Sequence, residues 1–333
     1  MKKILQQCMA NIRRYPALEK KIKDFISYST DDKILSKLPQ DLLDFIYFRI
    51  RMHLQNRFDW RRGAFRTNSL FQSFYHEISR YTSIEDKVIC DLGCGRMNAV
   101  GLSTIFYLNG CKSTYAFDIK NIDSKRSATG LYEILLECHA APENWLLSGF
   151  GREDYFNRLN TIDLDELKQG KMDRFFEKLP IGWDKKRLND IEIEDESIDI
   201  CFSQAVLEHL LSFDEAMAKL FQMMAPGGIM VHHVDFRDHR IIMEPQKYKW
   251  YSFLAEDEKW TDGLCNRLRP NQMKEIMEHV GFQVIEFVGE RSELPRTFQS
   301  RLAFPFSKMA IDEIETMGGM FAVRKPGKSK RIY

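Results

Sequence analysis

The stretch "VICDLGCGRMNAVG", residues 88–101, joins a short apolar run to a turn that contains two closely spaced glycines. The β-branched residues at its start are typical of a buried strand. Gly93 and Gly95 follow at once, and because glycine has no Cβ, backbone N–H groups in such a turn can come close to a ligand. The stretch therefore predicts a strand, a ligand-binding turn and a helix, in that order.

An acid, Asp91, lies two residues before the first of these glycines. A dinucleotide-binding fingerprint would place a third glycine at position 98, where the sequence has Asn98, and it would give Asp91 no task. A carboxylate just before the turn suits a positively charged ligand, which it can hold directly or through water. The stretch thus favours a cationic nucleotide over a dinucleotide.

Further strand-like runs follow along the chain and alternate with helical patterns such as "FDEAMAKLFQMM". The alternation is typical of βαβ units, and it predicts an α/β fold with a mostly parallel sheet covered by helices on both faces. After the helix that Gly281 ends, two more candidate strands close the domain. The expected strands are 87–92, 113–119, 197–203, 227–236, 283–290 and 318–325.

The composition limits the classes of function. The chain has 333 residues, 44% of them hydrophobic, and its 49 basic and 48 acidic residues leave a formal charge of +1. No bulk field therefore recruits nucleic acid or anionic lipid. The chain has no long apolar run typical of a signal peptide or a membrane span, and its seven cysteines form no CxxC pair, so we expect a cytoplasmic protein with reduced cysteines.

The domain boundaries follow from these patterns. Residues 1–85 are predicted to form a helical cap or lid, which could also make a homodimer. Residues 86–325 form the α/β domain, with insertions at about 120–185 and 236–270, and 326–333 form a flexible basic tail. We expect the first insertion to build part of a lid.

A second acid, Asp118, ends the next strand, about twenty residues after the glycine turn, where a carboxylate can accept hydrogen bonds from both ribose hydroxyls. With "VICDLGCG", "AFD" at 116–118, "SIDICFSQAVLEHL" and "MMAPGGIMVHHVDF", the chain resembles the class I S-adenosylmethionine-dependent methyltransferases over roughly residues 87–325. The resemblance implies a Rossmann-like fold with a seven-stranded sheet whose last strand is antiparallel, and S-adenosylmethionine as cofactor.

The resemblance also implies a set of cofactor-binding residues. The methionine end of the cofactor is expected near the first glycine turn, the ribose at Asp118 and the adenine at Ile119. The family's acid before the fourth strand is replaced by Arg187, so Asn189 or Asp190 is expected to contact the adenine instead. The full set is Asp91, Gly93, Cys94, Gly95, Asp118, Ile119, Asn189, Ser203 and Gln204.

The polar cluster "HHVDFRDH", residues 232–239, leaves the fifth expected strand at the edge where open α/β sheets bind ligands. Alternation places His233 and Asp235 on one face, where the imidazole could take a proton from an acceptor hydroxyl and the carboxylate could orient it. His209 in "VLEHL" is the other candidate base. A structural role in tying down the loop stays open.

The same cluster has a competing use as a metal site. His233, Asp235, Asp238 and His239 offer nitrogen and oxygen ligands for a divalent ion. Their spacing matches no diagnostic metal motif, so we expect no metal.

The second insertion is rich in aromatic residues and ends in "CNRLRP". Its rings could line an acceptor pocket or only anchor the loop, and its arginines could pair with a carboxylate or phosphate. The expected substrate residues are His239, Tyr248, Trp250, Arg267 and Arg269.

Three functions stay open. The first is O-methylation of a small molecule or sugar, because the cluster and insertion resemble a subgroup from bacterial polysaccharide and secondary-metabolite pathways. The second is methylation of nucleic acid or protein, which the near-zero charge and the absence of a "DPPY" or "NPPY" motif, where "SQAV" stands, disfavour. The third is a noncatalytic cofactor-binding scaffold.

Overall fold

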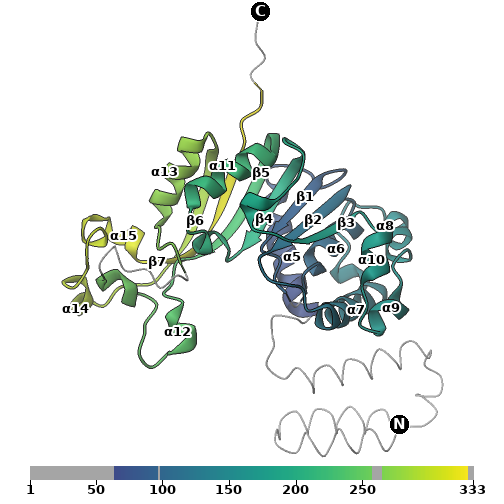
Figure 1. Cartoon of the computed structure of the whole chain (residues 1–333), viewed down its shortest axis with the longest axis horizontal. Coiled ribbons are helices and arrows are strands. Elements are labelled where there is room, and N and C mark those ends of the chain that lie inside the picture. The colour runs from purple at the N-terminus through teal and green to yellow at the C-terminus, as the bar shows by residue number, and fades with distance from the viewer. Residues whose placement is uncertain (1–63, 97, 257–264, 329–333) are drawn as a thin grey trace, which may run out of the picture.

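The computed structural model describes residues 64–96, 98–256 and 265–328 (Figure 1). Most of the expected N-terminal cap, residues 1–63, and the end of the expected tail, residues 329–333, lie outside the described residues. The expected homodimer contact through the N-terminal helices falls largely there as well.

A single seven-stranded sheet forms the centre of the domain, in the order β3-β2-β1-β4-β5-β7-β6. β7 runs antiparallel to both of its neighbours, and the pairs among β1 to β5 are parallel. This confirms the expected Rossmann-like sheet with an antiparallel last strand. The strands are β1 Val88–Leu92, β2 Ser113–Asp118, β3 Ile181–Lys185, β4 Ile198–Gln204, β5 Met224–Asp235, β6 Gln283–Arg291 and β7 Thr316–Arg324.

Two strands differ from the sequence expectation. β3, "IGWDK", was not predicted because it is short and only its first residue is buried, so it lacks a strong apolar pattern. β5 begins at Met224, before the expected start at 227, and includes the "APGG" turn. Its pairing with β4 shifts from Met224 to Ile229, and Gly227 takes a φ of 82° within that irregularity, which resembles a β-bulge.

Helices cover both faces of the sheet (Figure 1). Within the described residues, no helix combines the length and the apolar character needed to cross a bilayer. The α-helices are α5 Ala64–Ser79, α6 Gly101–Leu108, α7 Ser124–Ala140, α8 Arg152–Leu159, α9 Leu164–Lys168, α10 Asp173–Lys178, α11 Phe213–Met223, α12 Arg240–Met243, α13 Pro270–Val280, α14 Arg296–Gln299 and α15 Ile311–Ile314. Short 3₁₀ turns are η1 Pro142–Asn144, η2 Leu188–Asp190, η3 Leu207–His209, η4 Ser252–Ala255 and η5 Phe306–Lys308.

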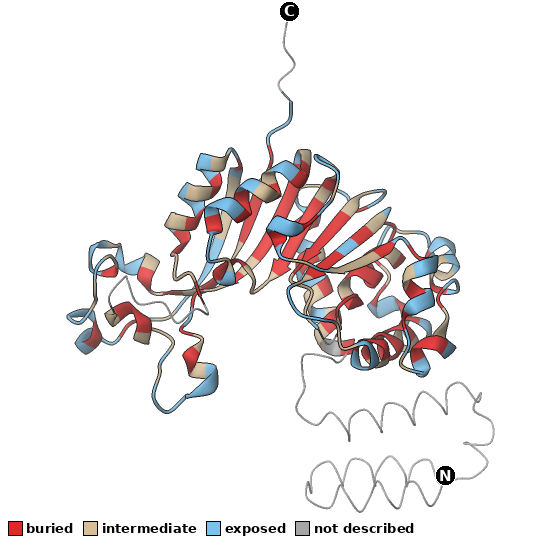
Figure 2. Ribbon diagram, viewed as in Figure 1, coloured by how far each residue is buried: buried red, intermediate tan, exposed pale blue. Residues whose placement is uncertain are grey.

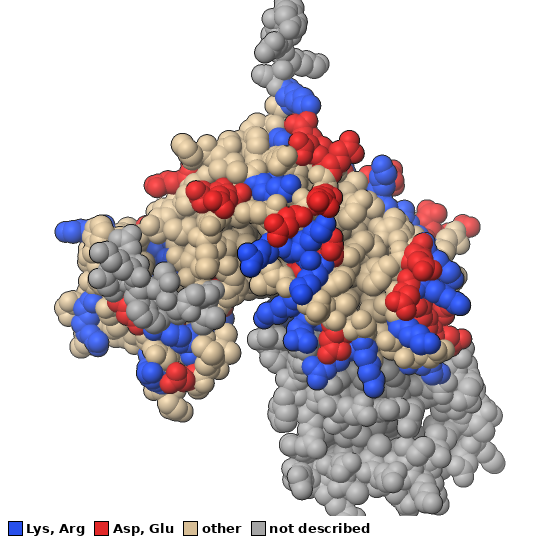
Figure 3. All heavy atoms as spheres, in the orientation of Figure 1, with Lys and Arg blue, Asp and Glu red and all other residues tan. Residues whose placement is uncertain are grey.

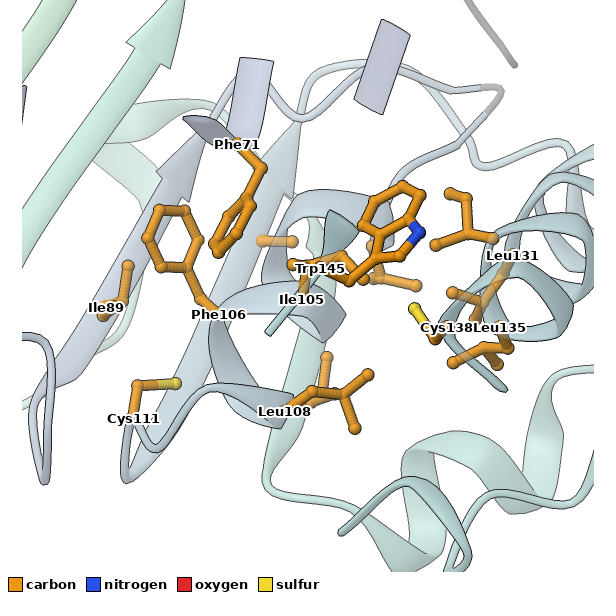
Figure 4. Close-up of a cluster of buried hydrophobic side chains, with 14 of the residues drawn as sticks. Phe71, Ile89, Ile105, Phe106, Leu108, Cys111, Leu131, Leu135, Cys138 and Trp145 are labelled. Atoms are coloured by element: carbon orange, nitrogen blue, oxygen red, sulfur yellow. The ribbon is translucent and has the colours of Figure 1, made fainter. Parts of the chain in front are cut away.

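The first face of the sheet packs against α5, α6 and the helices between β2 and β3. Figure 4 shows Phe71 of α5 beside Phe106 of α6 and Ile89 of β1, and the two phenylalanine rings meet edge to face with centroids 5.1 Å apart. Phe74 of α5 packs on Phe202 of β4 at 4.9 Å. These contacts place α5 in the same core as the sheet.

The opposite face packs against α11 and α13. Successive residues of β4 alternate between the two cores: Phe202 belongs to the first and Cys201 to the second. This follows from the two-residue period of a strand. The sheet is therefore buried on both sides, as the red strands of Figure 2 show.

The first insertion contributes to the core. α7 carries Leu131, Leu135 and Cys138 into it, and Trp145 and Tyr155 follow with exposures of 1% and 0%. Its helices contact α5 and α6. The insertion thus widens one layer of the domain, whereas its expected role as a lid stays a prediction.

A smaller lobe lies below β6 and β7 and contains α12, α14 and α15 (Figure 1). Its own apolar cluster joins Phe253 and Leu254 of the second insertion to Leu294, Phe298 and Phe306, which lie between β6 and β7. Two segments distant in the chain therefore fold together there. They form a wall next to the carboxyl ends of the parallel strands.

Candidate functional site

The glycine turn after β1 lies against the end of β2. The N–H groups of Gly93 and Cys94 both donate to the carbonyl of Phe117, at 2.8 and 3.0 Å. The carboxylate of Asp118 accepts from Gly95 N at 2.9 Å and from Lys120 N at 2.8 Å. The turn and the second acid are therefore fixed to each other before any ligand binds.

The two glycines serve different steric purposes. Gly93 has a φ of 70°, and a Cβ there would lie 2.3 Å from Val206 Cγ2, so the loops after β1 and β4 can approach only because Gly93 has no side chain. Gly95 has a φ of 80°, and a Cβ there would meet nothing within 4 Å. The space in front of Gly95 is open, which leaves room for a ligand against the backbone.

Asp91 is a buried acid with an exposure of only 5%. Burial raises the pKa of its carboxyl well above the usual value, and the charge of Asp118 raises it further. Within the described residues, no donor forms a hydrogen bond with this carboxylate. A cation beside Asp91 would offset both the cost of burying this carboxylate and its repulsion by Asp118. The site therefore fits the ammonium group of a methionine moiety.

The apolar side chain after Asp118 is exposed. Ile119 has an exposure of 64%, among the highest of the large hydrophobic side chains, and it borders the second acid. This arrangement leaves an apolar surface for a base beside a carboxylate for a ribose. The amide of Asn189 donates to Glu215 Oε2 of α11 at 3.4 Å, and both Asn189 and Asp190 are exposed, so the adenine contact expected of either residue stays a prediction.

Two histidines at the end of β5 are tied to the end of β4. Ser203 Oγ lies 2.7 Å from His232 Nδ1, and both residues are fully buried. Gln204 Nε2 lies 2.9 Å from His233 Nδ1. Burial lowers the pKa of His232 to about 3 and lowers the pKa of the less buried His233 as well. Both imidazoles are therefore neutral near pH 7, and His233 is the more accessible.

Asp235 does not form a hydrogen bond with His233, as the alternation along the strand had suggested it could. Its carboxylate accepts two hydrogen bonds from the Arg237 guanidinium, at 2.8 and 2.7 Å, and its Oδ2 lies 3.5 Å from His239 Nε2. Although burial alone would raise the pKa of Asp235, these partners hold it below the usual value. The ring of His233 is oriented by Gln204 instead.

A pocket opens between η3, the end of β5 and the second insertion. It holds about 310 Å³ of empty space, including its open mouth. Glu208 lines it with an exposure of 3%, and burial raises the pKa of its carboxyl to about 8. The other lining residues are Asp235, Phe236, Arg237, Asp238, His239, Phe253, Cys265, Asn266, Arg267, Leu268 and Arg269.

The other candidate base, His209, contacts two residues that line this pocket, His239 and Cys265. Its ring packs on the ring of His239 with centroids 4.9 Å apart. The Asp235 carboxylate raises the pKa of His239. The two predicted bases therefore belong to two separate clusters.

The expected substrate residues divide between the pocket and its scaffold. Tyr248 stacks on the Arg240 guanidinium at 4.2 Å, and Trp250 packs edge to face on Tyr251 at 5.3 Å, so both rings anchor the lobe. Arg267 lines the pocket and pairs with Glu256 at 3.2 Å.

Arg269 has a structural position. Its guanidinium is fully buried and donates to the backbone carbonyls of Phe236, Glu313, Ile314 and Thr316. Burial lowers its pKa to about 10. This side chain joins the second insertion to the segment before β7.

The metal set considered from the sequence is not gathered in the structure. Asp238 is paired with Arg240, and His233 is bonded to Gln204. Among the described residues, the one group of three or more His, Cys, Asp or Glu ligand atoms close together consists of His209, His239 and Cys265. Only His239 is common to both sets.

Three pocket residues were missed by sequence reasoning. Glu208 was not assigned to the site, Cys265 was grouped with the other buried cysteines, and Asn266 was not considered. Asn266 Nδ2 donates to the carbonyls of Leu207 and Leu210, at 2.8 and 3.0 Å, and so holds η3. No sequence pattern joins them, because the second insertion returns to η3 only in the fold.

Basic side chains gather on one face of the molecule beside the hollow below the sheet (Figure 3). Arg96, Lys120 and Lys185 are exposed and belong to the ends of β1, β2 and β3, which meet at one edge of the sheet. This local concentration contrasts with the formal charge of +1 of the whole chain. The positive charge of these residues favours an anionic group near the carboxyl ends of β1, β2 and β3.

Comparison with known proteins agrees with this geometry. Residues 62–287 match the model of a family described as a methyltransferase domain. No curated protein matches the chain.

The solved structures that resemble it include an S-adenosylmethionine-dependent methyltransferase from Mesorhizobium loti, with 13% identity, a TM-score of 0.41, and coverage of 76% of this chain and 97% of that one. Another, from Methanosarcina mazei, has 15% identity, a TM-score of 0.41, and coverage of 76% and 99%. Neither likeness bears on the acceptor.

Proposed function

Since the chain belongs to the methyltransferase-domain family and is an S-adenosylmethionine-dependent methyltransferase, we propose that it methylates a hydroxyl group of a small molecule or sugar. The observation that carries the proposal is the neutral, half-buried imidazole of His233, which Gln204 holds at the carboxyl end of β5. A hydroxyl acceptor must lose a proton as it is methylated, and a neutral imidazole can take it.

The cofactor-binding residues are proposed on the geometry of the first two strands. S-adenosylmethionine, when bound, supplies an activated methyl group on a sulfonium. Asp91 binds its ammonium, Asp118 its ribose hydroxyls, and Ile119 packs on its adenine. The Asp118 carboxylate keeps acceptor capacity for the ribose because each oxygen accepts one hydrogen bond from the backbone and has a further lone pair.

His233 acts as the base through its Nε2 atom. This requires the tautomer with the proton on Nδ1, so the Gln204 amide must turn its oxygen toward the ring, in place of the Nε2 that lies 2.9 Å from Nδ1, and accept a hydrogen bond from it. The charged groups that act on this ring are Glu290, Asp235, Arg66 and Arg237, two of each sign, so burial determines the lowered pKa. Positioning and proton removal are then the protein's main contributions to the reaction.

The acceptor is proposed to be a sugar or related polar molecule with a negative charge. The pocket beside Glu208 combines two aromatic side chains, Phe236 and Phe253, with polar groups. One of these polar groups is Asp235, two residues after His233 on β5, although His233 itself is not a lining residue. The arginines that line the pocket, Arg237 and Arg267, favour a phosphate or carboxylate on the acceptor. Nucleotide sugars of bacterial polysaccharide synthesis have this chemistry.

We place the reaction in the cytoplasm. The six cysteines among the described residues form no disulfide, although Cys90 and Cys201 stand opposite each other on β1 and β4. Reduced cysteines are typical of a reducing compartment.

The test is methyl transfer from labelled S-adenosylmethionine to a panel of sugars, nucleotide sugars, nucleic acids and proteins. We expect label in a sugar or nucleotide sugar, and we expect His233→Gln to remove it. His139→Gln is the control, because His139 on α7 also has a lowered pKa, although it is exposed, and it lies far from the end of β5 in the chain. Label only in nucleic acid or protein would contradict the proposal.

A further inference from the structure

Three side chains with metal-ligand atoms meet beside the pocket, and two of them, His239 and Cys265, line it. His209 belongs to η3 after β4, whereas His239 lies near the start of the second insertion and Cys265 near its end. One ligand atom from each lies within 4.8 Å of the other two, and Cys265 Sγ is 3.9 Å from His209 Nδ1. Three segments distant in sequence therefore bring two imidazoles and a thiol to one point.

The separations are close to those of a tetrahedral ion site. Metal–ligand bonds of about 2.0–2.3 Å place neighbouring ligand atoms roughly 3.3–3.7 Å apart. The 3.9 Å between Cys265 Sγ and His209 Nδ1 is slightly longer than this separation, and side-chain rotations can shorten it. His209 is exposed and can rotate, whereas Cys265 is only 8% exposed and is held in place.

The surroundings also point to a bound cation. Both carboxylate oxygens of Glu208, the residue before His209, are buried without a hydrogen-bond partner, although Glu208 lines the same pocket. Asp235 Oδ2 lies 3.5 Å from His239 Nε2. A carboxylate beside a metal-binding histidine is the usual companion that orients the ring.

We propose that His209, His239 and Cys265 bind a zinc-class divalent ion. Two nitrogens and a sulfur suit Zn²⁺ better than Mg²⁺ or Ca²⁺, which prefer oxygen ligands. Three protein ligands leave a fourth position for water or for an oxygen of a molecule in the pocket. The site goes beyond the methyl transfer proposed above, and the binding test does not depend on that proposal.

The ion would join η3 to the second insertion. η3 already contacts the insertion through the Asn266 N–H, which donates to the Glu208 carbonyl at 2.7 Å. Metal ligation by His209 and Cys265 would add a further link between the same two segments. It would therefore stabilise the wall of the pocket as well as bind there.

The experiment uses the full chain, stripped with a chelator and titrated with Zn²⁺ and with Co²⁺. We expect one equivalent of either ion to bind, and we expect Co²⁺ to give a thiolate charge-transfer band in the near ultraviolet. Cys265→Ser should remove that band, and His209→Ala should weaken Zn²⁺ binding. For Asp235→Asn, which changes only the companion carboxylate, a loss on the order of 10-fold or more is expected.

Matched controls come from the same chain. Cys138 is another buried cysteine, and His139 is another exposed histidine, both on α7. Cys138→Ser and His139→Ala should leave the stoichiometry and the cobalt band unchanged. His209 is exposed, so His209→Ala should fold even if Cys265→Ser does not, which circular dichroism will establish.

Two outcomes would overturn the proposal. One is that neither ion binds to the stripped protein at one equivalent. The other is that binding persists undiminished in both His209→Ala and Cys265→Ser, which would place the ion elsewhere. The retention of Zn²⁺ binding by a His233→Gln variant that has lost methyl transfer would separate this site from the proposed base.

Discussion

Replacing Asp91 by Asn tests the methionine end of the cofactor site. Asn has nearly the shape of a protonated aspartic acid but carries no charge. A charge-assisted hydrogen bond contributes about 1.5–3 kcal/mol, so S-adenosylhomocysteine, which keeps the ammonium group, should bind Asp91→Asn roughly 10- to 150-fold more weakly. Titration calorimetry measures this directly.

A comparison of two ligands distinguishes the loss of the ammonium contact from a general disruption of the cofactor site. Methylthioadenosine has the adenosine and the sulfur but lacks the amino-acid part, so Asp91→Asn should bind it as well as the wild type does. Asp118→Ala, in contrast, should weaken both ligands, by on the order of 1–3 kcal/mol, because the ribose is common to them. Equal losses for both ligands in Asp91→Asn, or no loss for S-adenosylhomocysteine, would refute the assignment of Asp91.

The same residue predicts a pH dependence. Burial and the charge of Asp118 raise the pKa of Asp91 in the free protein. Its other titratable neighbours, the Cys90 and Cys94 thiols, have raised pKa values and stay neutral. An ammonium partner would lower the Asp91 pKa, so binding releases a proton and affinity rises with pH up to the free-state pKa. Calorimetry in two buffers of different ionisation enthalpy should detect that proton, and Asp91→Asn should abolish it.

Asp91 makes the folded protein less stable as pH rises, whereas an ordinary ion-paired acid makes it more stable. The folded protein holds the Asp91 proton more tightly than the unfolded chain, so this residue lowers stability as pH rises from its unfolded pKa through its raised folded pKa. Asp91→Asn should therefore be at least as stable as the wild type at neutral pH in urea unfolding. A clear loss of stability would show that the carboxylate has a favourable partner.

The remaining predictions concern the base, the glycine turn and the buried arginine. His233→Gln should lower kcat by about 10²- to 10⁴-fold and leave the affinity for S-adenosylhomocysteine unchanged; full turnover would remove His233 as the base. Gly95→Ala should weaken the binding of S-adenosylhomocysteine. Gly227 has a similar φ of 82° and equally open space, so Gly227→Ala should lower the free energy of unfolding by a comparable amount and leave that binding unchanged. Arg269→Met should destabilise the fold by about 3–5 kcal/mol in urea, because buried carbonyls lose their donor; a change below about 1 kcal/mol would mean that they find other partners.

The sheet was largely predictable because its central strands are nearly continuous apolar runs. "VICDL" and "IDICFS" face helices on both sides, so their residues are apolar at almost every position. β3 was missed because it lies at the edge of the sheet, next to β2 alone, and can keep Trp183, Asp184 and Lys185 partly exposed. The apolar sequence pattern that predicts a strand is weaker in a strand that is less buried.

The site was predictable only where it depends on strand ends. Asp91 and Asp118 lie at the ends of adjacent parallel strands, so order and spacing along the chain are enough to bring them together. The cluster of His209, His239 and Cys265 depends instead on where an irregular insertion returns to η3. That return is fixed by Asn266 and by the buried Arg269, which carry no periodic pattern.

A crystal structure of the protein with S-adenosylhomocysteine tests the central claim most directly. It should show the ligand's ammonium within hydrogen-bond distance of the Asp91 carboxylate, both ribose hydroxyls at Asp118, and the amino-acid part passing over Gly95. A ligand bound elsewhere, or one whose ammonium and ribose contact neither acid, would contradict the account.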